Sequence, residues 1–332
     1  MIRGLVIGKF LPVHKGHLGL ISFAARQCDE LIVSMAEASN DPIDANLRLS
    51  WLKQLTAQWE NVKICSLKDD FDQEDLPWAV RTKTWASVIN KAYGHIDKVF
   101  SSEDYGEYFA RNLGAFSVLF DRQRKMFPVS ASSIRKSPFD YWEFIPEVVR
   151  PYFVKKICFY GPESTGKSST AIRMAKRYNT LSVPEVAREM ITTNDFTIED
   201  IIRIGHAQTD RVLELAPQAN KILFCDTDLI TTQIYSKYYL GVVPGILYEL
   251  EKQVTYDKYF FFDIDVPWIA DGLRDLGDKR EEMKEIFLKE LAVRNIDFVL
   301  VSGSPETRDE VIQKEIEKLI LPSPTSFPQS PT

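Results

Sequence analysis

Residues 156–170 read KICFYGPESTGKSST, and this stretch decides the fold expected for the second half of the chain. The apolar run Lys156–Tyr160 leads into residues 161–168, which match the pattern G-x-x-x-x-G-K-[ST]. That pattern is informative when a strand precedes it and a helix follows it, and here a helical pattern begins at Lys167. The stretch therefore predicts a strand–loop–helix unit of an α/β domain.

The same loop carries groups that suit phosphate. Its glycines allow backbone N–H groups to surround a β-phosphate at a helix N-terminus, which has a partial positive charge. Lys167 is expected to reach the β- and γ-phosphates of ATP, and the Ser168 hydroxyl to ligate Mg²⁺. We expect nucleotide contacts from Gly161, Glu163, Ser164, Thr165, Gly166, Lys167, Ser168 and Ser169.

Further apolar runs surround this loop, and we predict strands at residues 222–225, 259–264 and 298–302. Two acidic residues directly follow the run 222–225. Asp226 is a candidate ligand of Mg²⁺ and Asp228 a candidate substrate contact, because a metal-orienting carboxylate belongs after such a strand. Either residue could instead cap the helix that follows.

Other polar residues suit a phosphoryl-transfer site. Glu185 and Arg188 follow a short apolar run, where small kinases with this loop hold the phosphate acceptor. Glu185 or Asp226 could accept the proton of an acceptor hydroxyl. Arg274 lies in a polar segment typical of a closing lid and could neutralise the transferred group, or could be an ordinary surface arginine. Ser302 resembles the adenine-side loop of P-loop kinases.

The first 135 residues show the same alternation of apolar runs and helical patterns, which predicts a parallel sheet covered by helices. In such sheets ligands lie beyond the carboxyl ends of the strands. The expected strands are Leu5–Ile7, Leu31–Met35, Val62–Leu67, Lys98–Ser101 and Phe116–Phe120.

The turn after the first expected strand, residues 8–17, contains two of the four histidines. The spacing of His14 and His17 lets both imidazoles face one point, and Gly16 lets a phosphate approach the backbone. Zinc is one interpretation, but no third ligand lies nearby in the sequence. Phosphate fits better, because imidazole N–H groups at a helix N-terminus suit an anion.

A second candidate phosphate site lies at residues 129–135, VSASSIR, which open a predicted helix. The hydroxyls of Ser130 and Ser132, the N–H groups of the first turn and the Arg135 guanidinium could together bind phosphate. The simpler alternative is that these serines only cap the helix.

The composition sets limits on the whole chain. Its 332 residues suggest two domains, and a net charge of −6 gives no general attraction to nucleic acid or anionic membranes. No apolar run approaches a membrane span, so we expect no membrane insertion. The four cysteines lie far apart with no CxxC pair, which fits the reducing cytoplasm.

We predict domains at residues 1–136 and 155–321. The segment 137–154, SPFDYWEFIPEVVRPYFV, is rich in proline and aromatic residues and is expected to be a packed junction. Residues 322–332 are rich in Pro and Ser and are expected to be disordered.

The block G-x-F-x-P-x-H-x-G-H at residues 8–17 and the later block at residues 129–135 resemble the HxGH nucleotidyltransferase superfamily. The chain departs from that pattern with Val129 in place of Ile and Ser132 in place of the usual Thr. Together with GPESTGKS after the junction, the chain resembles NadR-type proteins from Ile2 to about Leu321. Some members carry an N-terminal helix-turn-helix domain, which we do not expect here because the chain begins at its first strand.

The resemblance implies a Rossmann-like nucleotidyltransferase domain followed by a P-loop kinase domain. The kinase would phosphorylate nicotinamide riboside to nicotinamide mononucleotide (NMN), and the other domain would join NMN to AMP from ATP, giving NAD and pyrophosphate. Mg²⁺ and ATP are implied for both steps. By resemblance, charge stabilisation in the first domain falls to Lys9, His14, His17 and Arg135, with further nucleotide contacts from Gly8, Phe10, Gly16, Ser130 and Ser132.

The nicotinamide ring is a flat cation that an aromatic face holds well. Trp78 and Trp85 are our candidates in the first domain, although both could simply belong to the core. Residues 101–103, at the end of an expected strand, could hold the adenine or ribose. We expect small-molecule partners and no nucleic acid, and the sequence leaves open whether the chain forms a homo-oligomer. Two alternatives stay open: a similar fusion acting on another metabolite, and an NAD- or ATP-binding sensor with one inactive domain.

Overall fold

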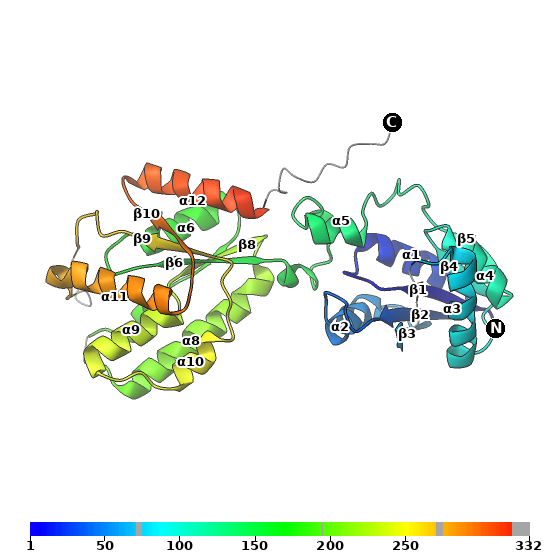
Figure 1. Ribbon diagram of the computed structural model, residues 1–332, viewed down its shortest axis with the longest axis horizontal. Helices are drawn as coiled ribbons and strands as arrows, with labels where there is room; N and C mark the ends of the chain where they lie inside the picture. The colour runs from blue at the N-terminus through cyan, green and yellow to red at the C-terminus, as the bar shows by residue number, and fades with distance from the viewer. Residues whose placement is uncertain (71–74, 194, 270–274, 321–332) are drawn as a thin grey trace. The chain divides into compact units, whose positions relative to one another are not determined.

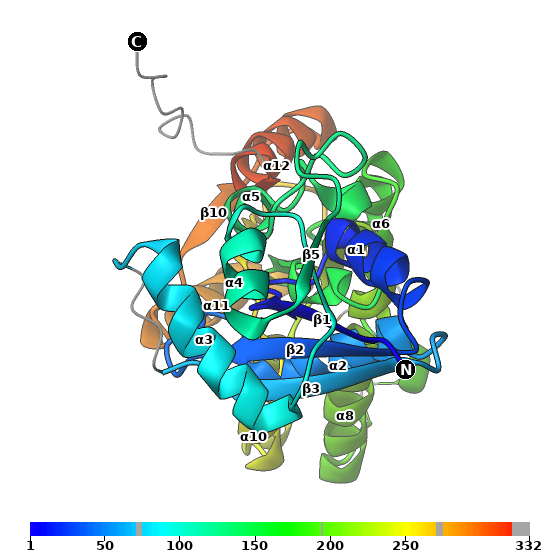
Figure 2. The same cartoon turned by 90° about the vertical axis from the view of Figure 1, so that its right-hand side faces the viewer.

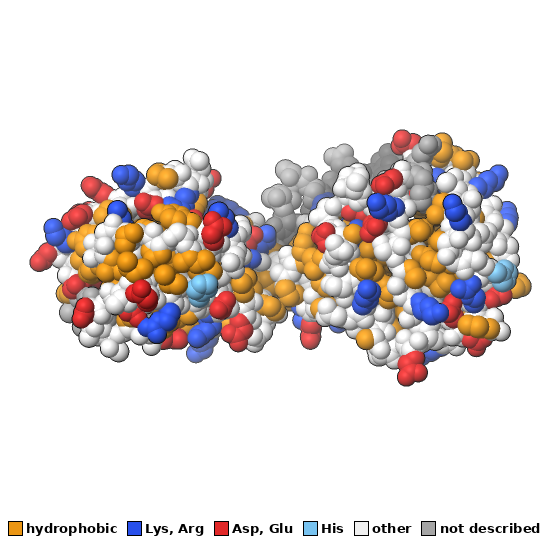
Figure 3. Space-filling model, turned by 90° about the horizontal axis from the view of Figure 1, so that it is seen from below, with side chains coloured by type: hydrophobic (Ala, Val, Ile, Leu, Met, Phe, Trp, Pro, Cys, Tyr) orange, Lys and Arg blue, Asp and Glu red, His pale blue; other side chains and the backbone are white. Residues whose placement is uncertain are grey.

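The computed structural model describes residues 1–332 except 71–74, 194, 270–274 and 321–332. The chain divides into two compact units, Met1–Val149 and Arg150–Thr332. Among the described residues, no helix combines the length and the apolar character needed to cross a membrane. On the face drawn in Figure 3, acidic and basic side chains are interspersed over both units.

Five parallel strands form the sheet of the first unit, in the order β3-β2-β1-β4-β5 (Figure 1). All five expected apolar runs lie in these strands, although β5 ends one residue earlier than expected. The strands are β1 (Arg3–Gly8), β2 (Glu30–Glu37), β3 (Val62–Lys68), β4 (Lys98–Ser101) and β5 (Phe116–Leu119). The helices are α1 (Lys15–Ala25), α2 (Ala45–Thr56), α3 (Trp78–Tyr93), α4 (Tyr105–Leu113) and α5 (Ala131–Lys136).

Alternating side chains bury both faces of this sheet. Leu5 and Val99 pack beneath α3 and α4, which lie side by side (Figure 2). Phe100, the next residue of β4, faces the other way and meets Phe23 of α1 with ring centroids 6.3 Å apart. The chain moves from β1 to β2 in one direction and later to β4 in the other. The carboxyl ends of β1 and β4 therefore form the switch point at which ligands bind in such sheets.

The sheet of the second unit is also parallel, in the order β10-β9-β6-β8-β7. Its strands are β6 (Lys155–Tyr160), β7 (Leu181–Val183), β8 (Ile222–Asp226), β9 (Lys258–Phe262) and β10 (Phe298–Val301). Its helices are α6 (Lys167–Arg177), α7 (Ala187–Met190), α8 (Ile198–Leu215), α9 (Leu229–Leu240), α10 (Ile246–Glu251), α11 (Arg280–Val293) and α12 (Pro305–Ile320). The short 3-10 turns of the whole described chain are η1 (Trp142–Phe144) in the first unit, and η2 (Arg150–Tyr152), η3 (Ala216–Gln218) and η4 (Gly277–Lys279) in the second.

The continuous apolar runs of the second unit reflect a sheet covered on both faces. Phe260 and Phe262 join one core with α6 and α12, whereas Phe261 joins the other with α9 and α11. The expected strand 259–264 is too long at its end, because β9 stops at Phe262. Beyond it the N–H of Asp263 still donates to the carbonyl of Val301, but the N–H of Ile264 donates to the Asp263 carboxylate at 2.8 Å and the chain bends there.

One close approach fixes the loop after β6. Gly161 has φ +134°, and a Cβ built there would lie 2.8 Å from the carbonyl oxygen of Phe262. Only glycine tolerates both conditions. The central strand can therefore turn into its loop directly beside β9.

We predict that Gly161→Ala destabilises the second unit by at least about 2 kcal/mol more than Gly241→Ala. Gly241 also has positive φ, +71°, but nothing lies within 4 Å of its Cβ position, so its substitution carries the cost of an ordinary left-handed residue without a clash. Calorimetry of the full chain measures both variants, with the transition of the first unit as internal reference. Equal shifts in the two variants would show that the contact with Phe262 is unimportant.

Candidate functional site

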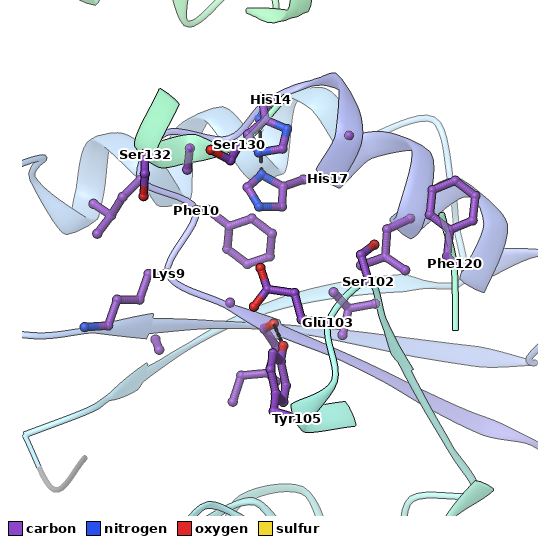
Figure 4. A pocket seen from close by; sticks show the side chains of 18 of the residues that line it. Lys9, Phe10, His14, His17, Ser102, Glu103, Tyr105, Phe120, Ser130 and Ser132 are labelled. Carbon is purple, nitrogen blue, oxygen red and sulfur yellow. Dashed lines mark hydrogen bonds between the residues drawn. The ribbon is translucent and has the colours of Figure 1, made fainter. Parts of the chain in front are cut away.

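The first unit has a cavity of about 560 Å³ at the carboxyl ends of β1 and β4. Figure 4 shows the strand ends, the start of α1 and the start of α5 around it. The cavity brings together predicted residues that are far apart in the sequence. Those that line it are Gly8, Lys9, Phe10, His14, Gly16, His17, Trp78, Trp85, Ser130, Ser132 and Arg135.

The two histidines stack at the N-terminus of α1, with ring centroids 3.7 Å apart and planes 25° apart. The backbone N–H of His14 donates to Nδ1 of His17 at 3.3 Å. That bond keeps Nδ1 of His17 unprotonated, so the neutral ring carries its proton on Nε2. Among the described residues, no group of three His, Cys, Asp or Glu side chains could hold a metal, so the zinc interpretation gains no support.

Burial keeps both imidazoles uncharged. It lowers the pKa of His14 to about 3 and the pKa of His17 well below the ordinary value, with a further contribution from the nearby Arg124 charge. Neutral imidazoles donate N–H groups without the cost of a buried charge. The pair is therefore a set of uncharged hydrogen-bond donors at neutral pH.

The loop between β1 and α1 is held by a residue that sequence reasoning missed. Arg48 of α2 is fully buried and donates to the carbonyls of Lys9, Ala36 and Ile43. It also pairs with Asp41 at 2.7 Å. In the sequence Arg48 is one basic residue within an amphipathic helix, so only its unusual burial reveals the role.

Lys9 and Arg135, the two predicted cationic residues of the first site, differ in where their side chains lie. Figure 4 shows the Lys9 side chain extending away from the histidine pair. Arg135 donates to the carbonyl of Leu11 and, at 3.3 Å, to Oγ of Ser132. Ser130 caps α5 by accepting from the N–H of Ser133 at 3.0 Å, so its expected capping role and its place on the cavity wall coexist.

Arg124 and Glu103 form an ion pair on the cavity wall. Their side chains meet at 3.1 Å, and Arg124 also donates to the carbonyl of Val129 at 2.9 Å. Glu103 follows β4 and points toward Phe10 in Figure 4. Arg124 was not predicted; its signal was a basic residue in the loop after the last strand of the sheet.

Aromatic rings make one wall of the cavity. Trp78 and Trp85 of α3 surround Tyr105, with ring centroids 5.4 and 5.7 Å from it. The guanidinium carbon of Arg81 lies 4.2 Å from the centroid of the Trp78 ring. The face of Trp78 therefore already carries a planar cation of the protein itself.

In the second unit the loop from Gly161 to Ser168 joins β6 to α6. Gly166 caps α6 with φ +88°. Lys167 is buried, and its ammonium donates to the carbonyls of Gly161 at 2.8 Å and Pro162 at 2.7 Å. Burial also lowers its pKa. The Lys167 ammonium thus binds loop carbonyls, and the backbone N–H groups of the loop are left for a ligand.

Four other predicted loop side chains bind protein groups. Thr165 donates to the carbonyl of Pro162 at 2.9 Å, and Ser169 to that of Gly166 at 3.0 Å. Ser164 accepts from the N–H of Ile269 at 2.8 Å, and Glu163 accepts from the N–H of Leu276 at 3.0 Å and from the indole of Trp268 at 3.3 Å. Their side chains therefore shape the loop and connect it to Trp268, Ile269 and Leu276.

Asp226 has the surroundings of a metal ligand. It is 2% exposed, and its Oδ1 has no hydrogen-bond partner among the described residues. Burial, with the nearby Glu185 charge, raises its pKa to about 6, whereas the adjoining Ser168 hydroxyl acts in the opposite direction. A carboxylate and a hydroxyl side by side fit Mg²⁺, which takes few protein ligands and completes its shell with water and phosphate.

Asp228, predicted to contact substrate, has a structural role instead. Its Oδ1 accepts from the N–H and the hydroxyl of Thr231, at 2.9 and 3.1 Å, and caps α9. Its Oδ2 accepts from the Tyr259 hydroxyl at 3.0 Å. With both oxygens engaged in the interior, the capping alternative is the one observed.

A smaller cavity of about 90 Å³ lies beside the loop. Glu185 and Arg188 line it and pair at 2.8 Å. Tyr235 and Tyr239 of α9 also line it with nearly parallel rings, 24° apart. These tyrosines were not predicted; their four-residue spacing on one helix face was the available signal.

Arg274 lies outside the described residues. Ser302 directly follows β10 and precedes Gly303, whose N–H donates to the Asp265 carboxylate.

Family models match both halves of the chain. Residues 5–137 match the model described as "Cytidylyltransferase-like", and residues 156–308 match the model described as "AAA domain". These matches identify a nucleotidyltransferase domain and a P-loop domain.

Curated relatives span both domains. The chain is 32% identical over 328 residues to the "Trifunctional NAD biosynthesis/regulator protein NadR" of Escherichia coli (strain K12), covering 90% of this chain and 78% of that protein. It is 26% identical over 163 residues to the "Nicotinamide-nucleotide adenylyltransferase" of Thermococcus onnurineus (strain NA1), covering 47% of this chain and 83% of that protein.

The fold is similar to that of solved structures. A crystal structure of NadR protein in complex with NAD and AMP-PNP has a TM-score of 0.77 and 23% identity, and covers 96% of both chains. With both domains, their order and the extent of the identity to the Escherichia coli protein in view, this chain belongs to the NadR family of nucleotidyltransferase–kinase enzymes.

Proposed function

We propose that the second unit phosphorylates nicotinamide riboside with ATP and that the first unit transfers AMP from ATP to the resulting NMN, giving NAD and pyrophosphate. The observation that carries this proposal is that one chain holds both a histidine-lined cavity with an aromatic wall and a P-loop beside a buried carboxylate. Solved NadR proteins bound to NAD with AMP-PNP and to NR support the choice of substrates.

In the first unit the nucleophile is a phosphate oxygen of NMN. It forms a bond to the α-phosphorus of ATP while the bond from that phosphorus to the bridging oxygen breaks and pyrophosphate leaves. The nucleophile is already an anion, so no general base is needed. The uncharged N–H donors of His14 and His17 and the guanidinium groups of Arg124 and Arg135 stabilise the negative charge in transit.

The aromatic wall of this cavity selects the other half of the substrate. The nicotinamide ring carries a positive charge, and Trp78, with Trp85 and Tyr105 behind it, presents a face to such a cation. The contact of the Arg81 guanidinium with the Trp78 ring, at 4.2 Å, supports this choice. The nicotinamide ring of NMN would displace the Arg81 guanidinium from the Trp78 face, or would stack beside it.

In the second unit the loop N–H groups would bind the phosphates of ATP, and the Lys167 ammonium would exchange its bonds to the Gly161 and Pro162 carbonyls for bonds to the phosphates. Ser168 and Asp226 would hold Mg²⁺, which neutralises charge on the β- and γ-phosphates. The acceptor is a neutral hydroxyl and must lose a proton. Glu185 is our candidate base, because it lines the smaller cavity. Asp226 faces Ser168 instead, and the flat rings of Tyr235 and Tyr239 suit the nicotinamide of the riboside.

Substitution of one residue in each unit separates the two activities. Lys167→Ala should lower riboside phosphorylation by at least about 10²-fold and leave NAD formation from NMN intact, and His17→Ala should do the reverse. Chromatography of products from Mg-ATP with riboside, or with NMN, measures both. Each variant is the folding control for the other.

Other product patterns decide between the alternatives. If the unsubstituted chain formed no product from either substrate, the nicotinamide assignment would be wrong, and another metabolite would have to be sought. NMN accumulating from riboside without NAD would make the first unit a binding or sensing module.

Asp226→Asn should stabilise the second unit at pH 8 and abolish riboside phosphorylation. The folded-state pKa of Asp226, about 6, lies above its ordinary value of 3.8. Ionising this carboxyl is therefore harder in the folded chain, and the free energy of unfolding falls as pH rises from about 4 to 6. The neutral amide avoids that cost but binds Mg²⁺ poorly. Calorimetry and product assays measure both effects, and a lower unfolding temperature in the variant at pH 8 would contradict the account.

The histidine pair should remain uncharged across the physiological range. In NMR titrations of the chain labelled with ¹⁵N-histidine, His14 and His17 should show no titration between pH 5.5 and 8, because burial lowers both pKa values. His14→Gln and His17→Gln assign the signals. A midpoint near the ordinary value of about 6.5 in either ring would refute uncharged donation.

A further inference from the structure

We infer that Arg308 is a positioning residue of the ATP site in the second unit, where its guanidinium holds the phosphate-binding loop and the turn after β10 in one rigid frame. The inference rests on the proposed kinase function of this unit. Arg308 lies in the first turn of α12, 140 residues after the loop in the sequence, and was not among the residues predicted from motifs.

The side chain is 3% exposed, and its contacts reach three segments. Nη1 donates to the carbonyl of Thr165 in the loop at 2.6 Å, and Nε donates to the carbonyl of Gly303 at 3.0 Å. Nη2 donates to the carbonyl of Asp263 at 3.3 Å and pairs with the Asp265 carboxylate. One planar group of α12 thus joins the loop, the segment after β9 and the turn after β10.

The contact with Thr165 determines how the loop presents its donors. Thr165 immediately precedes Gly166 and Lys167, at the point where the loop becomes α6. A Cβ at Gly166 would lie 3.8 Å from Nη1 of Arg308, so the guanidinium lies directly behind the loop. In a loop of this kind the N–H groups face the anion, and the carbonyls need donors on the opposite side.

The contact with Gly303 extends the frame to the other end of the nucleotide. Gly303 has φ +91°, its N–H donates to Asp265, and its carbonyl accepts from Arg308. Ser302, the residue expected near adenine, directly precedes it. Because Asp265 and Arg308 are themselves paired, the turn and the loop cannot shift independently.

Lysine cannot replace this group. A guanidinium presents five N–H donors in a planar fork, whereas an ammonium is a single point charge with three donors. Removing the fork would take this donor away from the carbonyls of Thr165, Gly303 and Asp263, and would leave the Asp265 carboxylate with only the N–H of Gly303. The expected result is a loosened loop with poor affinity for ATP.

Arg294 provides a matched control. It is also largely buried and pairs with Glu251 at 2.7 Å and with Glu290, and it donates to Gln233 at 2.8 Å. Those contacts join α9, α10 and α11, with none of them to residues 161–168. Arg294→Ala therefore removes a comparable buried network without touching the loop.

Kinetics of the full chain test the inference. Arg308→Ala and Arg308→Lys should raise the KM for ATP in riboside phosphorylation by about tenfold or more. NAD formation from NMN in the same preparation should be unchanged, and Arg294→Ala should lower thermal stability without changing that KM. Millimolar methylguanidinium should partly restore Arg308→Ala by refilling the space.

Hydrogen exchange gives a readout that does not depend on the substrate. In Arg308→Ala the amides of residues 161–168 and 302–304 should exchange faster together, whereas Arg294→Ala should leave them protected. If Arg308→Ala fails to fold, Asp265→Asn takes its place. Unchanged KM and protection, or equal effects in Arg294→Ala, would overturn the inference. Failure of the parent chain to phosphorylate riboside, with coupled exchange intact, would overturn the proposed function and leave the frame standing.

Discussion

Both sites depend on one constraint: a loop that turns its N–H groups toward an anion must turn its carbonyls toward the protein, where they need donors. In the first unit Arg48 and Arg135 bind the carbonyls of Lys9 and Leu11. In the second unit Lys167 and Arg308 bind carbonyls of the P-loop. Cationic side chains therefore support each loop from behind and add positive charge near the ligand.

The same parallel-sheet frame supports two chemistries because burial acts oppositely on acids and bases. Desolvation disfavours the charged form of any side chain. It lowers the pKa values of the histidine pair in the first unit, which leaves neutral donors suited to an anionic nucleophile. It raises the pKa of Asp226 in the second unit, whose buried carboxylate gains from binding a cation.

Each cavity also presents aromatic side chains, which come from different helices in the two units. Trp78 and Trp85 come from the beginning of α3, whereas Tyr235 and Tyr239 come from α9. Both sets of rings lie beside charged groups, Arg81 in one cavity and the Glu185–Arg188 pair in the other. Two unrelated arrangements thus offer a flat aromatic face next to charge, which supports the nicotinamide-bearing substrates proposed for both units.

The sequence by itself determined the two α/β domains, the order of their strands along the chain and the positions of the loops that follow β1 and β6. Apolar runs and short motifs encode these features locally, through strand propensity and glycine conformation. Only the tertiary structure decided that Asp228 caps a helix, that β9 ends at Phe262 and that Arg48, Arg124 and Arg308 support the sites. The bond from Arg308 to Thr165 joins residues 143 apart. Such contacts depend on strand order and burial, which no local pattern specifies.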